Sequence, residues 1–116
     1  MRFGLIFCVA LIYLASVDAQ NAGDLGPETK VTNEILSYTT QLQWQIEDMA
    51  GVSKFEMFQA ETFRKQTVTD GYEFFIKIRV AFYDYIHVRI HKDLSSKITL
   101  ISVLVGKTKD DPIQYF

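Results

Sequence analysis

The sequence of 116 residues contains one cysteine, Cys8, and this scarcity limits how the fold can be stabilised. Small domains outside the cell usually rely on disulfides, but a single cysteine cannot form an intramolecular pair. A chain of this length buries enough surface for one modest core, so the core itself must hold the fold together. N-glycosylation sites are missing too, because neither Asn21 nor Asn33 is followed by the required Asn-x-Ser/Thr pattern.

Motifs for catalysis, metal binding or nucleic-acid binding are also absent from the sequence. There is no glycine-rich phosphate loop, and no serine has an organised histidine and aspartate neighbourhood. The net charge of −2, with both signs spread along the chain, argues against a nucleic-acid partner. His87 and His91 would lie roughly 13 Å apart along a strand, too far to share one metal ion, and we expect both to be exposed. The sequence therefore predicts neither an enzyme nor a cofactor.

The first nineteen residues have the pattern of a targeting segment. Arg2 supplies a positive charge, residues 3–15 are almost wholly apolar, and Val17-Asp18-Ala19 places small residues at −3 and −1 of a cleavage site. The apolar run is shorter than the roughly 20 residues that span a bilayer. We therefore predict a signal peptide over residues 1–19, a secreted protein, and no membrane association after cleavage. An uncleaved anchor segment is the alternative.

The remaining domain, residues 20–116, is expected to begin with a mobile arm and one long helix. Thr32 or Asn33 can cap this helix, and Gly51 can close it. Apolar residues at spacings of three and four form a stripe, and it consists of Ile35, Tyr38, Leu42, Ile46 and Met49. The stripe spans fewer than three heptads, so it favours packing on a sheet over a coiled coil.

From Lys54 onward the hydrophobic period is two, which predicts strands. The expected strands cover residues 54–66, 72–81, 84–93, 97–106 and 113–116. The fourth is apolar on both faces, so we expect it to be central or covered. No crossover helix separates these strands, and the predicted class is therefore α+β, with one long helix packed on a four- to five-stranded antiparallel sheet.

One connection in this predicted sheet is unusual. The strands 54–66 and 72–81 are joined by Thr-Val-Thr-Asp-Gly, with Val68 near the middle of the link. A valine at a hairpin tip contributes little to folding, which suggests that it serves another purpose.

Six stretches, in the same order along the chain, resemble the type 1 cystatins (stefins). They are Gly23-Asp24-Leu25, Phe58-Gln59-Ala60, Phe63-Arg64-Lys65-Gln66, Phe74-Phe75-Ile76-Lys77-Ile78, Tyr85-Ile86-His87-Val88-Arg89-Ile90 and the tail from Lys107 to Phe116. The resemblance covers essentially residues 22–116. It implies the cystatin fold and a reversible, tight-binding inhibitor of papain-like cysteine proteases of the cathepsin L or B type. It implies a monomer as well, with a domain-swapped dimer as a second form on heating.

In stefins an N-terminal arm and two hairpins form a wedge that fills the protease cleft, so the resemblance implies three groups of binding residues. These are Ala22 and Gly23 in the arm, Gln66, Thr67, Val68, Thr69, Asp70 and Gly71 in the first hairpin, and Leu94 and Ser95 in the second. Two departures fall at these sites. The first hairpin is one residue longer than the family's Gln-Val-Val-Ala-Gly, and Leu94-Ser95-Ser96 replaces Leu-Pro-Gly. A cystatin-fold binding module without protease inhibition is therefore the alternative function.

Overall fold

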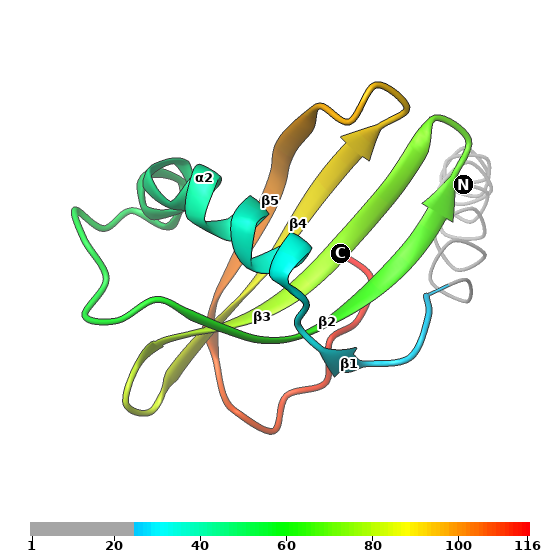
Figure 1. Ribbon diagram of the computed structural model, residues 1–116. Helices are drawn as coiled ribbons and strands as arrows, with labels where there is room; N and C mark the ends of the chain where they lie inside the picture. The colour runs from blue at the N-terminus through cyan, green and yellow to red at the C-terminus, as the bar shows by residue number, and fades with distance from the viewer. Residues whose placement is uncertain (1–24) are drawn as a thin grey trace, which may run out of the picture.

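The computed structural model describes residues 25–116, and it shows one helix lying across one antiparallel sheet (Figure 1). The elements are β1 (Thr29–Lys30), α2 (Asn33–Ala50), β2 (Gln59–Val68), β3 (Gly71–Ala81), β4 (Asp84–Asp93) and β5 (Ile98–Lys107). Their order in the sheet is β1-β2-β3-β4-β5. The predicted α+β class and the helix on an antiparallel meander are confirmed. The predicted signal peptide, residues 1–19, lies outside the described residues.

Local signals at both ends determine the extent of α2. The Thr32 hydroxyl accepts a hydrogen bond from the Ile35 amide at 3.3 Å, and Gly51 closes the helix in the left-handed conformation at φ 80°. The predicted helix bounds are therefore confirmed. Met49 was expected in the core but is 51% exposed in the last turn, whereas Thr39, which the spacing analysis left out, is buried. No helix in the described part of the chain has the length and hydropathy of a membrane span.

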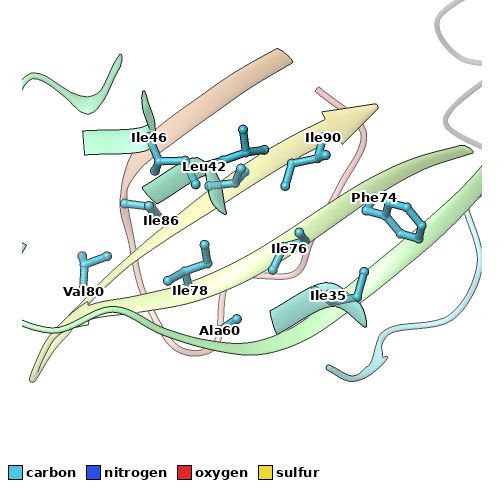
Figure 2. Packing of buried hydrophobic residues seen from close by; sticks show 11 residues of the cluster. Ile35, Leu42, Ile46, Ala60, Phe74, Ile76, Ile78, Val80, Ile86 and Ile90 are labelled. Atoms are coloured by element: carbon cyan, nitrogen blue, oxygen red, sulfur yellow. The ribbon is translucent and has the colours of Figure 1, made fainter. Parts of the chain in front are cut away.

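The main core lies between α2 and one face of the sheet (Figure 2). Its fully or almost fully buried members are Ile35, Leu42, Ile46, Ala60, Phe74, Ile76, Ile78, Val80, Ile86, Val88 and Ile90. The alternation predicted for β3 is therefore correct for its helix-facing side chains. Burying each such aliphatic side chain contributes roughly 1.5–3 kcal/mol, so these contacts are the main source of stability.

The opposite face of the sheet is covered by the C-terminal segment, residues 108–116. Ile113 is fully buried, and the ring of Phe75 on β3 packs 5.5 Å from the ring of Phe116 between centroids. The Lys77 ammonium donates to the Lys109 carbonyl at 2.7 Å. The strand expected over residues 113–116 is wrong, because this segment is held by side-chain packing and by side-chain bonds to its carbonyls instead of a strand ladder.

Two further expectations about the sheet need correction. The strand expected from residue 54 begins at Gln59 and continues to Val68. The strand β5 lies at the edge of the sheet, and β3 is central. Although β5 is apolar on both faces, Ile101 and Val105 are exposed. Apolar composition alone cannot distinguish a central strand from an edge strand whose side chains are only partly covered.

Candidate functional site

The tips of the β2–β3 and β4–β5 hairpins lie side by side at one end of the sheet (Figure 1). Gly71, the first residue of β3, stands directly opposite Asp93, the last residue of β4. The β3–β4 hairpin, with Phe82 and Tyr83 at its turn, lies at the other end. The fold thus places two of the three predicted binding groups in one continuous surface.

The first hairpin is tighter than the sequence suggested. Val68 is the last residue of β2 and pairs with Gly71, so the turn consists of Thr69 and Asp70 alone. Val68 is partly buried at the end of its strand and is not the centre of an open five-residue loop. Thr67 also pairs with Tyr72, the first residue of the strand expected over residues 72–81. The β2–β3 ladder therefore extends up to the turn.

Gly71 fixes the position of this tip against β4. Its φ of 143° lies in a region that residues with a side chain rarely adopt. A Cβ atom on Gly71 would lie 2.0 Å from the Lys92 carbonyl oxygen and 3.0 Å from the Asp93 Cα. Only glycine allows the two strands to approach this closely, so the first tip is pressed onto the base of the second hairpin.

The side chains of the first hairpin differ in how far they are available to a partner. Thr67, Thr69 and Asp70 are exposed, but Gln66 is only 3% exposed. Gln66, one of the expected binding residues, therefore has its side chain inside the fold and not on the surface of the tip. Tyr72, which was not among the expected binding residues, is partly exposed beside the tip, with the Lys65 ammonium 4.2 Å from its ring centroid. The position of an aromatic residue directly after Gly71 is the feature of the sequence that could have identified it.

The second hairpin is organised by Asp93. Its Oδ1 accepts hydrogen bonds from the Ser95 amide at 2.9 Å, the Ser95 hydroxyl at 2.8 Å and the Lys97 amide at 2.9 Å. The bonds from Ser95 and Lys97 lower the pKa of the Asp93 carboxyl. Ser96 adopts φ 71°, and Leu94 projects into solvent with 80% of its surface exposed. The loop therefore presents an apolar side chain on a turn that is fixed by hydrogen bonds.

The third predicted group, Ala22 and Gly23, lies outside the described residues. The described chain begins at Leu25 and runs antiparallel to β2, with the Gly26 amide donating to the Lys65 carbonyl at 2.8 Å. The Arg64 guanidinium donates to the Gly26 carbonyl at 2.6 Å. Traced backward from Thr29, this segment therefore runs along β2 toward the first hairpin tip.

A charged cluster links the two hairpins on the sheet face away from α2. His91 on β4 stands opposite Glu73 on β3, with 3.2 Å between His91 Nδ1 and Glu73 Oε2. The other ring nitrogen, Nε2, lies 3.6 Å from Asp70 Oδ2 in the first turn. Arg89 donates to Glu73 and to the Phe116 carbonyl oxygen. Through these contacts, β4 supports both the first hairpin and the C-terminal segment.

His87 is not exposed as expected but buried under the C-terminal segment, and its Nε2 has no hydrogen-bond partner among residues 25–116. Burial, together with the positive charges of Lys107 and Lys77, lowers the pKa of His87 to about 4. Within residues 25–116, no three histidine, cysteine or acidic side chains are grouped so that they could hold a metal ion.

Comparison with known proteins identifies several relatives along most of the chain. Cystatin-B of Macaca fuscata fuscata is 33% identical over 93 residues, which are 78% of this chain and 90% of the relative. Stefin-C of Bos taurus is 30% identical over 83% of this chain and 96% of the relative. Leukocyte cysteine proteinase inhibitor 1 of Sus scrofa is 32% identical over 82% and 93%. Comparison with models of protein families gives no match.

These relatives contradict the expected secreted location. They are stefins, which are proteins of the cytosol, so the localisation inferred from residues 1–19 is wrong. An apolar run followed by small residues satisfies the pattern of a signal peptide, but the pattern does not by itself establish secretion.

The fold and the relatives point to the same family. A helix lies across an antiparallel meander, and relatives at 30–33% identity are covered over nine-tenths of their length or more. The chain therefore belongs to the stefin family, the type 1 cystatins.

Proposed function

We propose that this chain is a reversible, tight-binding inhibitor of papain-like cysteine proteases of the cathepsin L or B type. In this proposal the end of the sheet that carries the two adjacent hairpin tips enters the protease cleft. The main observation in its favour is the pairing of Gly71 with Asp93, because this pairing places the two hairpin turns next to each other in a single edge. The relatives support it, since one of them is named as a cysteine proteinase inhibitor.

The rigidity of this edge favours binding. Val68 and Gly71 pair in the ladder, and Asp93 holds the second turn with three hydrogen bonds. A loop that is already ordered loses little conformational entropy when it binds. Leu94 supplies the most exposed apolar side chain of the edge, and burying it in a cleft is favourable by roughly 1.5–3 kcal/mol.

The same rigidity explains why the tips would resist cleavage. A protease substrate must lie extended in the cleft, with its scissile carbonyl at the catalytic cysteine. The first hairpin turns back within Thr69 and Asp70, and its strands are hydrogen-bonded to each other. The edge would therefore fill the cleft without presenting an extended peptide. The relative from Sus scrofa is named as an inhibitor, which fits a chain that blocks a reaction instead of catalysing one.

The three groups of binding residues remain part of the proposal. The first hairpin would contribute through Thr67, Val68, Thr69, Asp70 and Gly71, with Gln66 acting from inside the fold. The second would contribute through Leu94, with Ser95 ordering the turn. Ala22 and Gly23, which lie outside the described residues, are the third group.

The test is a titration of papain with the wild-type chain and with two matched aspartate variants. Leu94→Asp places a charge at the proposed edge, and Tyr83→Asp places the same charge at the exposed turn at the other end of the sheet. We expect reversible inhibition by the wild type and by Tyr83→Asp, and inhibition at least tenfold weaker by Leu94→Asp, since desolvating an unpaired charge costs at least about 1–3 kcal/mol.

One observation favours a second candidate function, a cystatin-fold binding module without inhibition. Asp70 places a carboxylate, with 75% of its side chain exposed, in the turn that would enter a desolvated cleft. A wild-type chain that folds but does not inhibit papain or a cathepsin L-type enzyme would support this second function and contradict the first.

A further inference from the structure

We propose that His91 is a positioning residue for the first hairpin, and that it makes the binding of a cysteine protease stronger in mild acid than at neutral pH. The inference rests on the proposed function, because it concerns the same edge. His91 itself lies below the tip, with only 16% of its side chain exposed, so it would act through Asp70 and not by touching the protease.

The geometry places the imidazole between two carboxylates. Nε2 of His91 lies 3.6 Å from Asp70 Oδ2, and Nδ1 lies 3.2 Å from Glu73 Oε2. Asp70 belongs to the two-residue turn, whereas Glu73 belongs to β3, just after that turn. The ring therefore ties the exposed turn to the body of the sheet at its base.

The charges around the His91 ring determine whether a positive charge on it strengthens or weakens protease binding. Asp70 and Glu73 contact it, Asp93 lies near it on the same strand, and Arg89 is the neighbouring cation. The Arg89 guanidinium is already engaged by Glu73 and by the Phe116 carbonyl oxygen. Of these cations, only a protonated His91 contacts Asp70 and can offset the negative charges at the turn.

Histidine is the side chain whose charge ordinarily changes between about pH 5 and 8. A positive charge on the His91 ring attracts Asp70 and holds the turn against β4. A neutral ring lacks this attraction, whereas Glu73 keeps its pair with Arg89 and Asp93 keeps its hydrogen bonds within the second turn. The tip is then less ordered, and binding must supply the ordering entropy.

The first experiment compares inhibition constants at pH 5.5 and pH 7.5 for the wild type, His91→Gln, Asp70→Asn and the double variant. At each pH the inhibition constant of a variant is divided by that of the wild type, which removes the effect of pH on the protease itself. We expect His91→Gln to weaken inhibition about two- to fivefold at pH 5.5 and to have little effect at pH 7.5, as for a partly exposed ion pair. In the Asp70→Asn background, His91→Gln should have little further effect at either pH. The double variant should be no weaker than either single variant.

The second experiment needs no protease. In the free chain, the NMR amide resonances of Thr69 and Asp70 should differ between pH 7.5 and pH 5.5, and this difference should disappear in His91→Gln. The positioning role would be overturned if the amide shifts were the same in His91→Gln as in the wild type. It would also be overturned if His91→Gln weakened inhibition equally at both pH values. Absence of inhibition by the wild type would instead overturn the proposed function, while the NMR result would still decide whether His91 holds the turn.

Discussion

Gly71 and Asp93 stand opposite each other in the β3–β4 ladder, and this pairing joins the two hairpin tips. The first tip depends on a residue without a side chain, because a Cβ at Gly71 would meet the Lys92 backbone. The second depends on a carboxylate that accepts three hydrogen bonds. Each half of the proposed edge can thus be perturbed by a single substitution.

Replacing Gly71 with alanine should destabilise the chain and weaken inhibition together. The new Cβ would be 2.0 Å from the Lys92 carbonyl, so the backbone must move, in addition to the strain of φ 143°. We expect a loss of about 3 kcal/mol or more in the free energy of unfolding. The matched control is Gly51→Ala. Its φ is 80°, but the added Cβ would meet no atom within 4 Å apart from its chain neighbours, so the free energy of unfolding should fall by about 1–2 kcal/mol. Equal losses would show that the contact with β4 is unimportant.

Stability should fall as the pH is lowered from about 7 to about 4 because of His87. Its pKa is about 4 in the folded chain, below the ordinary value of 6.5, so the unfolded chain binds more protons in this range. The contribution is fully present above pH 6.5 and decreases as the pH falls toward 4, by up to roughly 3 kcal/mol. Chemical denaturation of the wild type and of His87→Leu at pH 7, 5.5 and 4.5 measures it. The variant should show a shallower pH dependence, and an unchanged slope would contradict this assignment.

The C-terminal segment should be an integral part of the fold. Ile113 is fully buried against the sheet, whereas its neighbour Gln114 is exposed. We expect Ile113→Ala to lower the free energy of unfolding by about 2–5 kcal/mol, as for other large-to-small core substitutions. Gln114→Ala should change it by less than about 0.5 kcal/mol. Similar small effects of both variants on urea denaturation would mean that the segment does not cover the sheet in solution.

The second hairpin should tolerate the loss of the Ser95 hydroxyl. Ser95→Ala removes one bond to Asp93 but leaves the amide bonds from residues 95 and 97. We expect the inhibition constant for papain to change by less than threefold, which is under about 0.7 kcal/mol. Asp93→Ala removes all three bonds and should weaken inhibition by more than Ser95→Ala does. The opposite order would contradict the role of Asp93 in ordering the turn.

The parts of the fold that the sequence predicted correctly depend on local signals. Thr32 and Gly51 mark the ends of α2, because capping involves residues within one turn of each terminus. The alternation in β3 identified its helix-facing side chains, since a strand's period is a property of the strand itself.

The parts that it did not predict depend on contacts between distant segments. The edge position of β5 depends on the order of strands in the sheet, which the pattern of one strand does not contain. The burial of His87 depends on the C-terminal segment, which crosses the sheet about twenty residues later in the chain. The contact between His91 and Asp70 likewise joins β4 to the β2–β3 turn, and only the register of the sheet brings them together.

The most direct test of the central claim is hydrogen–deuterium exchange of the chain, free and in complex with active-site-titrated papain. The claim is that the edge formed by the two hairpin tips is the surface that enters the protease. We expect new protection at residues 67–71 and 94–97, and none at the β3–β4 turn, residues 82–83, at the other end of the sheet. Protection at residues 82–83 without protection at both tips would contradict the account, even if the chain inhibits papain.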